Sequence, residues 1–486
     1  MPLLFIGSVP TVLSMNFLYQ ALEQQLTEQI ESGQLPLGSR LPSVRSLCKE
    51  QGLSKSTVLT AYARLEAAGL VNARPKSGYF VCYQPQSAVV KHRAEQAQPP
   101  AFINQDALLL DIMDQSSAFD ICPGQTEPSC NEPLRRCLGR AARRQKGADQ
   151  HYYNEPSGLL GLRKQLQRRC ADGGSRVTED QLVVTGGCQH SLLLALMAVT
   201  RPGDTVAVES PGFYGVLQLL ESLGLKAVEI PSLVDTGLSP DALLMALQNW
   251  SISALVVMPA YATPTGACMT DQNRQRLVNI VAQYDLPVIE DDIYGDLTFA
   301  LQRPRTLHSY AQDQGFDGVM LCSSISKSLS RDLRIGWIVP GRYLAEVKKL
   351  KLVTMLAGSH MSQLGLQMYM EEGSYERHIR HYRQQLVQQC AQLQQLIRQL
   401  FPDTVTYSQP RGGLVLWLEL PEHIDTLALY NQARQFGISI TPGQLFSSQD
   451  RYQNCLRLSF AQPWNEPRIA ALKTLAGLVI EWAEPN

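Results

Sequence analysis

The sequence lacks the features that mark several classes of protein. Its eleven cysteines form no Cys-x-x-Cys pair, which argues against a structural zinc site and against the disulfide framework of a secreted protein. The histidines are not spaced as metal ligands, so we expect no metal. No run of about 18 apolar residues occurs, so we expect no membrane span. Residues 1–15 are apolar but lack the basic start of a signal peptide, and we interpret them as an extension. These absences favour a cytoplasmic protein.

Net charge is also nearly absent. The 43 Lys and Arg residues balance 44 Asp and Glu residues, for a formal charge of -1. Over the whole chain this balance argues against a surface coated with positive charge for nucleic acid or membrane. The charge is divided unevenly, however, because residues 1–83 carry 7 basic and 5 acidic side chains, whereas residues 84–486 carry 36 and 39. A small cationic module is therefore averaged with a larger, slightly anionic one.

Composition along the chain predicts three zones. The chain is 44% hydrophobic, so it can bury large cores, and its length favours several domains. Residues 16–83 have the pattern of helices followed by two short strands. Residues 84–118 are rich in Gln and Pro, which predicts a linker. Residues 119–486 alternate apolar runs with helical patterns.

Short, nearly continuous apolar runs in the third zone predict strands that are buried on both faces. Helical stretches, such as residues 191–199, separate several of them. We therefore predict an α/β fold with a mainly parallel sheet over about residues 160–340, and a smaller α+β part over about residues 345–486. In the smaller part, residues 382–400 favour a long helix and residues 413–420 a strand. The predicted sheet strands are Leu182–Val184, Thr205–Val208, Ala254–Val257, Val288–Ile289 and Val319–Cys322.

The first zone has the pattern of a winged helix-turn-helix. Apolar residues at four-residue spacing predict a helix over residues 17–32. Ser43 and Ser54 are placed to cap two further helices. Two strand-like runs, Leu70–Ala73 and Tyr79–Tyr83, then predict a hairpin. Two short helices joined by a tight turn and followed by a hairpin form a DNA-binding motif.

The charge of the first zone points to the same function. From Arg40 to Lys76 the sequence has seven Lys or Arg residues and only two acidic residues. The run Ser54-Lys55-Ser56-Thr57 starts the third helix with small hydroxyl side chains and a cation, which suits contacts with phosphate and with a DNA groove. A solvated helical hairpin with ordinary surface charge is the alternative.

Three motifs follow one another through residues 16–83. They are Gly38-Ser39-Arg40-Leu41-Pro42-Ser43-Val44-Arg45, Ser54-Lys55-Ser56-Thr57-Val58 and Ala73-Arg74-Pro75-Lys76-Ser77-Gly78-Tyr79-Phe80-Val81. In order and spacing they resemble the GntR family of bacterial transcriptional regulators. Lys55 stands where the family often has Arg, which keeps a phosphate contact but changes how a guanine is recognised. The DNA contacts that the resemblance implies are Arg40, Arg45, Lys55, Thr57 and Lys76. We add Ser43, Ser54 and Ser56 as candidates.

Polar and aromatic side chains follow the predicted strands of the third zone, where the ligands of an open α/β sheet bind. Two glycines open a helix after the first strand, which suits a phosphate. A pyridoxal phosphate site needs a lysine for the Schiff base, an acid that keeps the pyridine nitrogen protonated, and an aromatic ring that stacks on the cofactor. Each of these residues alone is more often a surface, capping or core residue, so the ordered set carries the prediction. Its members are Gly186, Gly187, Phe213, Asp291, Asp292, Tyr294, Lys327 and Arg334.

The motif Ser324-x-Ser326-Lys327, followed by Arg334-x-Gly336, strengthens this prediction. It resembles the Schiff-base signature of class I and II aminotransferases, which are fold type I pyridoxal phosphate enzymes. The resemblance covers about residues 119–480. It implies that Lys327 forms the internal aldimine with pyridoxal 5'-phosphate.

The same resemblance assigns the other site residues. Asp291 would hold the pyridine nitrogen, and Tyr294 would bond the ring oxygen O3′. Arg457 would clamp a substrate carboxylate with two hydrogen bonds. Tyr153 would reach the phosphate of the partner subunit. Further implied contacts are Phe213 and Thr263 at the ring, and Gly187, Cys188, Gln189, Ser324, Ser326 and Arg334 at the phosphate.

Three positions depart from the family pattern. Cys188 stands where Ser or Ala is more usual, and Thr263 stands where Asn is common. Arg331-Asp332 replaces a usual Pro-Gly pair. We expect these changes to preserve cofactor binding and to make efficient transamination less secure.

A GntR-type unit, a linker and an aminotransferase-like unit in one chain resemble the MocR-type regulators. The resemblance implies a head-to-tail homodimer whose two DNA-binding units bind a double-stranded DNA operator. We predict a regulator whose second unit senses an amino acid, an amine or the cofactor itself through the aldimine at Lys327. The alternatives are an active pyridoxal phosphate-dependent aminotransferase with an accessory DNA-binding unit, and a DNA-binding protein with an inactive scaffold.

Overall fold

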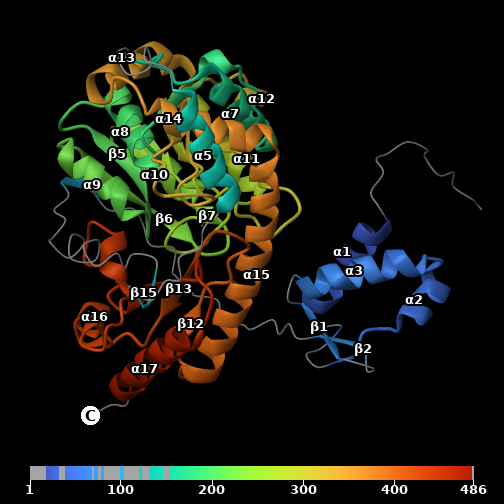
Figure 1. Cartoon of the computed structure of the whole chain (residues 1–486). Helices are drawn as coiled ribbons and strands as arrows, with labels where there is room; N and C mark the ends of the chain where they lie inside the picture. Colours follow the sequence, from blue (N-terminus) through green and yellow to red (C-terminus); the bar gives the residue numbers. More distant parts are fainter. Residues whose placement is uncertain are drawn as a thin grey trace, which may run out of the picture. The chain divides into compact units, whose positions relative to one another are not determined.

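The computed structural model describes residues 18–31, 35, 39–67, 70–74, 78–81, 99–102, 120–122, 131–145 and 153–483. The chain divides into two compact units, Met1–Ser87 and Ala88–Asn486. Figure 1 shows the elements of each unit, and each is considered by itself. The predicted extension and most of the predicted linker lie outside the described residues.

The first unit contains the predicted helices and hairpin. Its elements are α1 (Leu18–Glu31), α2 (Val44–Gln51), α3 (Lys55–Ala67), β1 (Val71–Arg74) and β2 (Gly78–Val81). The Ser43 hydroxyl accepts a 3.0 Å hydrogen bond from the Ser46 amide and caps α2. Gly52 ends α2 with a left-handed φ of 66° that glycine adopts without strain. The predicted winged helix-turn-helix is confirmed.

One feature of the hairpin formed by β1 and β2 was not predicted. The Leu41 amide donates to the Tyr79 carbonyl and the Val81 amide donates to the Ser39 carbonyl, each at 2.9 Å. Residues 39–41 therefore extend the two-stranded hairpin on its β2 side. Tyr62 links α3 to the residue after this segment, because its hydroxyl donates to the Pro42 carbonyl at 2.5 Å.

The second unit is built on the predicted sheet. The strand order is β3-β6-β5-β8-β9-β10-β11-β4, with β7 paired to β6. Neighbours from β6 to β10 are parallel, whereas β3 and β11 run against them. The prediction of a mainly parallel sheet is therefore confirmed. The strands are β3 (Ala101–Phe102), β4 (Val183–Thr185), β5 (Thr205–Ser210), β6 (Lys226–Leu233), β7 (Gly237–Leu238), β8 (Ala254–Val257), β9 (Val288–Asp291), β10 (Val319–Ser324) and β11 (Gly336–Val339).

Helices cover both faces of this sheet (Figure 1). Successive strand residues point to opposite faces, so Val206 and Val208 pack with α8, α9 and α13, whereas Ala207 packs with α10, α11 and α12. The helices are α5 (Glu132–Arg144), α7 (Leu160–Asp172), α8 (Cys188–Val199), α9 (Tyr214–Ser222), α10 (Pro240–Asn249), α11 (Asp271–Gln283), α12 (Leu307–Asp313), α13 (Leu344–Thr354) and α14 (His360–Glu371), with short 3-10 turns at Glu179–Gln181, Gly341–Tyr343 and Gly443–Phe446.

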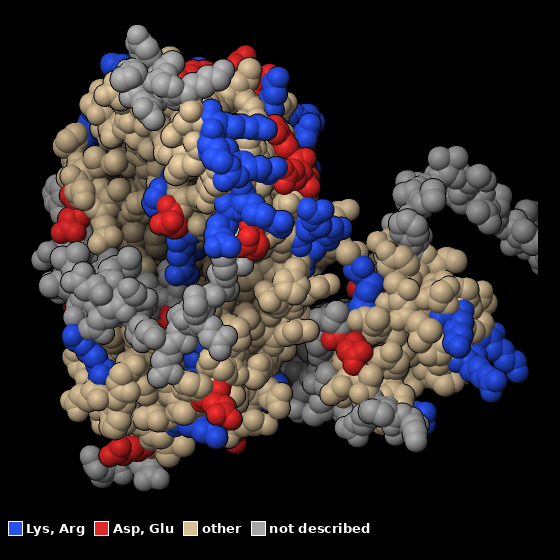
Figure 2. All heavy atoms as spheres, viewed as in Figure 1, with Lys and Arg blue, Asp and Glu red and all other residues tan. Residues whose placement is uncertain are grey.

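Helix α5 is strongly amphipathic. Leu134, Cys137 and Ala141 form its buried face, which packs against α14. Figure 2 shows basic side chains gathered over the outer face of α5, where Arg143 and Arg144 are exposed. No helix in the described part of the chain is long and apolar enough to cross a membrane.

A smaller antiparallel sheet follows the long helix α15 (Ser374–Leu400). Its order is β12-β13-β15-β14. The predicted strand over residues 413–420 appears as β13, and Arg457 lies on β15 directly opposite Trp417. The elements are β12 (Thr406–Tyr407), β13 (Val415–Glu419), β14 (Thr441–Pro442), β15 (Cys455–Ser459), α16 (Thr426–Arg434) and α17 (Glu466–Ala483).

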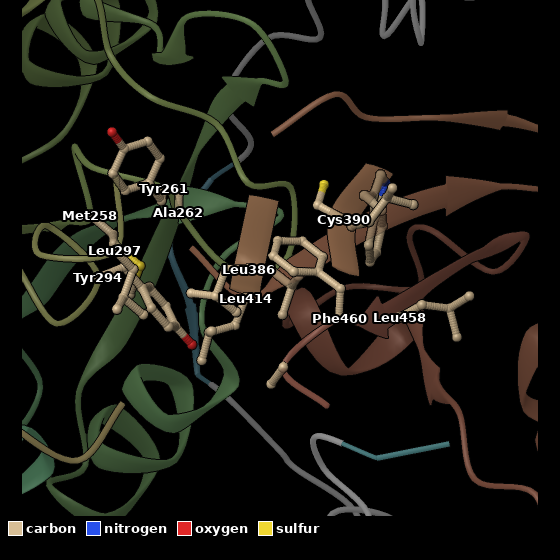
Figure 3. Close-up of a cluster of buried hydrophobic side chains, with 14 of the residues drawn as sticks. Met258, Tyr261, Ala262, Tyr294, Leu297, Leu386, Cys390, Leu414, Leu458 and Phe460 are labelled. Carbon is tan, nitrogen blue, oxygen red and sulfur yellow. The ribbon is translucent and has the colours of Figure 1, made fainter. Parts of the chain in front are cut away.

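One continuous apolar cluster joins the two sheets of the second unit. Figure 3 shows Tyr294 and Met258, which follow strands of the large sheet, on one side of this cluster. Leu386 of α15, and Leu414 and Phe460 next to strands of the smaller sheet, lie on the other. Tyr294 therefore lies where the two parts of the second unit meet, in a cluster to which both parts contribute side chains.

Candidate functional sites

The carboxyl ends of the parallel strands share one edge of the large sheet. Thr185, Ser210, Asp291 and Ser324 are the last residues of β4, β5, β9 and β10. The segments that follow these strands carry most of the predicted site residues. Ligands of open α/β sheets bind at this edge, so the sheet supplies the frame that the sequence pattern predicts.

The turn into α8 is shaped for an anion. Gly187 has a φ of 110°, and a Cβ atom there would lie 2.7 Å from Arg334 Nη2. Arg334 adopts a left-handed φ of 50°, and its Nη2 donates to the Gly186 carbonyl at 3.0 Å. A guanidinium group and the free amides of a helix N-terminus thus lie together, as a phosphate group requires.

The serines before the lysine complete this cradle. The Ser324 hydroxyl accepts a 3.1 Å hydrogen bond from the Ser326 amide. The hydroxyl oxygen of Ser326 is buried and has no hydrogen-bond partner among the described residues. A buried hydroxyl without a partner is costly and suits a ligand oxygen. Gln189 is held differently, because its Nε2 donates to the Gly215 carbonyl at 2.8 Å.

Asp291 lies at the end of β9 and is 2% exposed. Its Oδ1 accepts hydrogen bonds from the Cys188 thiol at 3.2 Å and from the Ile293 amide at 3.1 Å. Burial raises the pKa of Asp291 to about 6, and these two donors oppose the rise. The carboxyl group is thus mainly ionised at neutral pH, as a partner of a protonated pyridine nitrogen must be.

Lys327 lines a large cavity and is otherwise surrounded by protein. Burial lowers the pKa of its amine well below the ordinary value, and the charges of Arg331 and Arg457 lower it further. Asp291 is near enough to oppose this shift. The neutral amine is the form that can attack a carbonyl carbon. Burial also raises the pKa of Tyr294, which stays a phenol.

An aromatic face lies on the same side. Phe213 and Asp291 line one cavity of about 20 Å³ together with Glu209 and Met258. The Phe213 ring packs on Tyr214 with centroids 4.9 Å apart. The predicted stacking residue and the predicted pyridine partner are therefore neighbours.

Arg457 is 2% exposed and connects the smaller sheet to this edge. Its Nη1 donates to Thr263 Oγ1 and its Nη2 to Thr441 Oγ1, each at 3.2 Å. The guanidinium carbon lies 5.2 Å from the Phe446 ring centroid and 5.8 Å from that of Tyr214. Both forked donors thus engage neutral hydroxyls, which a ligand carboxylate can replace.

Two predicted contacts are not brought together with the rest. Tyr153 is 81% exposed, so within one chain it does not pack against the candidate site. Lys76 lies outside the described residues. Sequence reasoning also missed Thr441, which faces Arg457 only because β14 pairs with β15 at that register.

The first unit presents the start of α3 to solvent. The Ser54 hydroxyl accepts from the Thr57 amide at 3.1 Å and is 2.8 Å from the hydroxyl oxygens of Ser56 and Thr57. Ser54 is therefore the cap of the candidate recognition helix as well as a candidate DNA contact. The exposed candidates are Arg40, Ser43, Arg45, Ser54, Lys55 and Ser56.

Comparison with known proteins identifies both units. Residues 126–470 match the family described as aminotransferase class I and II. The chain belongs to this family. Residues 18–81 match the bacterial regulatory proteins of the gntR family. The two matches together form the MocR architecture, a gntR-type DNA-binding unit joined to an aminotransferase-type unit.

Similar proteins share the whole arrangement. The chain is 38% identical over 469 residues to the uncharacterized HTH-type transcriptional regulator YjiR of Escherichia coli, which covers 95% of this chain and 98% of that protein. It is 35% identical to YdcR of the same organism, over 95% and 99% of the two chains. The solved structure of LysN, an α-aminoadipate aminotransferase from Thermus thermophilus, has the same fold as the second unit, with a TM-score of 0.71 and 24% identity over 79% of this chain and 97% of that one.

Family membership indicates pyridoxal 5'-phosphate as the cofactor of this aminotransferase-type unit. The residues present fit it in four respects. Gly187 lets the guanidinium group of Arg334 approach the turn more closely than a residue with a Cβ atom would. The buried Ser326 hydroxyl lacks a partner among the described residues. Burial lowers the pKa of the Lys327 amine well below its ordinary value and raises the pKa of Asp291 to about 6.

Proposed function

We propose that the chain is a DNA-binding transcriptional regulator whose aminotransferase-type unit holds pyridoxal 5'-phosphate on Lys327 and senses an amino acid or amine there. The observation that carries the proposal is that Lys327, the buried Asp291 and the turn at Gly187 and Arg334 lie at one edge of the large sheet, in a chain whose residues 18–81 match the gntR family. The names of its full-length relatives, which are called transcriptional regulators, support the same assignment.

When bound, the cofactor supplies an aldehyde that condenses with amines and a ring that withdraws electrons. The protein supplies the rest. Burial disfavours the charged form of the Lys327 amine, and the neutral form is the one that makes the covalent link. Asp291 would keep the proton on the pyridine nitrogen, and the Cys188 thiol orients that carboxylate through Oδ1. Gly187, Ser326 and Arg334 would hold the phosphate.

The effector amine would exchange with the amine of Lys327. Arg457 would bind the effector's carboxylate, because its two donors already lie in a fork on the hydroxyls of Thr263 and Thr441. An amino acid therefore fits better than an amine without a carboxylate. The cavity of about 1020 Å³ that Lys327 lines lies between the lysine loop and α15, and Arg457 is not part of its lining.

We further propose that the chain acts as a homodimer. The exposed Tyr153 side chain supports this, because a residue that reaches a partner's phosphate does not pack on its own site. Two copies of the chain would carry two DNA-binding units, one for each half-site of an operator. The exposed Arg40, Arg45 and Lys55 would contact its phosphates or bases.

The test combines a spectrum with a footprint. The purified protein should show a visible absorbance band that borohydride removes, and Lys327→Ala should lose it. The matched control is Lys351→Met, because Lys351 is also buried and has a pKa lowered by burial to about 8, but bonds the Pro156 carbonyl. Amino acids should change both the band and the DNA footprint of the wild type.

Two results would overturn the proposal. A footprint that ignores cofactor, amino acids and Lys327→Ala would leave the second unit without a sensing role. Steady-state turnover of an amino acid and a 2-oxo acid, without any effect on DNA binding, would identify a working aminotransferase instead.

A further inference from the structure

A buried ionic cluster lies directly behind the candidate cofactor site. Arg303 bonds Asp292, the residue after Asp291, and its Nη1 lies 3.0 Å from Asp296 Oδ1. Arg169 of α7 approaches the same Asp296 Oδ1 at 2.8 Å. The side chains of Asp292, Asp296, Arg169 and Arg303 are each exposed by 10% or less. Two carboxylates thus meet two guanidinium groups away from water.

The cluster is held firmly in its charged form. Burial acts to raise the pKa of Asp296, but the charges of Arg169 and Arg303 outweigh it and lower that pKa to about 2. A buried ion pair adds little stability over an apolar core but is costly to break. Its position is therefore well fixed relative to β9.

Tyr375 extends this cluster to the lysine loop. It lies in the first turn of α15 and is 1% exposed. Its hydroxyl donates to Asp296 Oδ2 at 3.0 Å, so it can only accept from the Ser328 hydroxyl, 2.9 Å away. The Arg169 guanidinium carbon lies 5.0 Å from its ring centroid and packs against it. Ser328 is the residue after Lys327.

A second contact from the same turn holds the same loop. His378 Nε2 lies 2.8 Å from the Ser328 carbonyl oxygen and donates to it. Tyr375 thus bonds the side chain of Ser328, and His378 bonds its backbone carbonyl. Arg383, two turns further along α15, donates through Nε to the Asp296 carbonyl at 2.6 Å.

We propose that Tyr375 is a positioning residue that couples Lys327 to helix α15. The inference rests on the proposed attachment of the cofactor to Lys327. Any movement of Lys327 toward the cofactor, or away from it when an effector amine replaces it, pulls on Ser328 and through it on Tyr375. Helix α15 has 27 residues and is about 40 Å long. It runs from beside the large sheet to α17 of the smaller part (Figure 1), so the state of the lysine reaches the far end of the unit.

The coupling is tested on the full-length protein with bound pyridoxal phosphate. Tyr375→Phe and Ser328→Ala each remove the same hydrogen bond from opposite sides. Each should weaken cofactor retention roughly threefold to tenfold and reduce the visible circular dichroism of the bound cofactor. In the wild type the cofactor should slow amide hydrogen exchange in the first turns of α15, and both variants should lose this protection. The double variant should be no worse than the poorer single variant.

Tyr310→Phe is the matched control. Tyr310 is also a buried tyrosine, 7% exposed, but it lies on α12, and its hydroxyl bonds Asp271. This variant should retain the dichroism and the exchange protection of the wild type. Variants that lower the melting temperature but leave the dichroism, the retention and the protection of α15 unchanged would overturn the inference. Additive losses in the double variant would overturn it as well. A wild type that binds no cofactor would instead refute the proposed function, and this inference with it.

Discussion

Replacing Asp291 with asparagine separates two effects of this buried carboxylate, its effect on the stability of the fold and its effect on cofactor binding. In the cofactor-free protein, burial raises the pKa of Asp291 from its ordinary 3.8 to about 6. At about 1.4 kcal/mol for each pH unit, this difference means that the ionised group destabilises the folded state by about 3 kcal/mol at neutral pH. The Cys188 thiol and the Ile293 amide reduce this cost without removing it.

The sign of the pH dependence follows from the direction of the shift. Because the pKa of Asp291 is higher in the folded than in the unfolded chain, its contribution to the free energy of unfolding falls as pH rises from about 4 to about 6. Asp291→Asn removes that contribution. The variant should match the wild type near pH 4 and exceed its stability by up to about 3 kcal/mol at pH 7. Its cofactor binding should be weaker, because the amide carries no charge for the pyridine nitrogen.

Urea denaturation of the second unit, in protein stripped of cofactor by hydroxylamine, measures this difference. Asp450→Asn is the control, since Asp450 is exposed. It should change the unfolding free energy little at either pH. If Asp291→Asn is no more stable than the wild type at pH 7, or gains the same free energy of unfolding at pH 4 and pH 7, the raised pKa of Asp291 does not govern this difference in stability.

Three further changes have expected outcomes. Gly187→Ala would place a methyl group 2.7 Å from a guanidinium nitrogen at a φ of 110°, so cofactor retention on dialysis should fall by about tenfold or more. Ser54→Ala removes the cap of α3 and should lower the unfolding free energy of the first unit by about 1 kcal/mol in urea, whereas Ser56→Ala keeps the cap. Asp296→Asn should lower stability by about 2 kcal/mol at pH 7, and the gap should close as pH falls from about 4 to about 2, because two buried arginines hold the pKa of this carboxylate at about 2.

The predicted strands of the large sheet are short apolar runs, although β11, which is also apolar and buried, was not among them. Strand β6 was missed, because Glu229 and Pro231 interrupt its apolar run. Glu229 is 3% exposed, and its carboxylate accepts hydrogen bonds from Ser210, Ser447 and Ser448. Two of these three serines lie more than two hundred residues away, so the sequence around Glu229 does not indicate that its buried carboxylate has hydrogen-bond donors.

The site could be predicted where a motif is local. The lysine and the phosphate turn follow strands and the acid ends one, and the parallel sheet brings them to one edge. Tyr375 and Thr441 could not be found in this way. The partner of Tyr375, Ser328, is 47 residues away, and Thr441 faces Arg457 only through strand pairing. Both are supplied by the docking of the smaller part on the large sheet.

The bond between Arg457 and Thr263 bears on the choice between sensing and turnover. In the resembling enzymes an Asn commonly occupies the position of Thr263 and bonds the cofactor ring, but here the threonine hydroxyl accepts from Arg457. On the proposed function, an effector carboxylate that binds the Nη1 and Nη2 donors of Arg457 competes for them with the hydroxyls of Thr263 and Thr441. Binding then changes the hydrogen bonds beside the cofactor without the cleavage of the effector's Cα–H bond that transamination requires. A regulator needs only that response to occupancy, and so the departure at position 263 that weakens the case for transamination supports a sensing role.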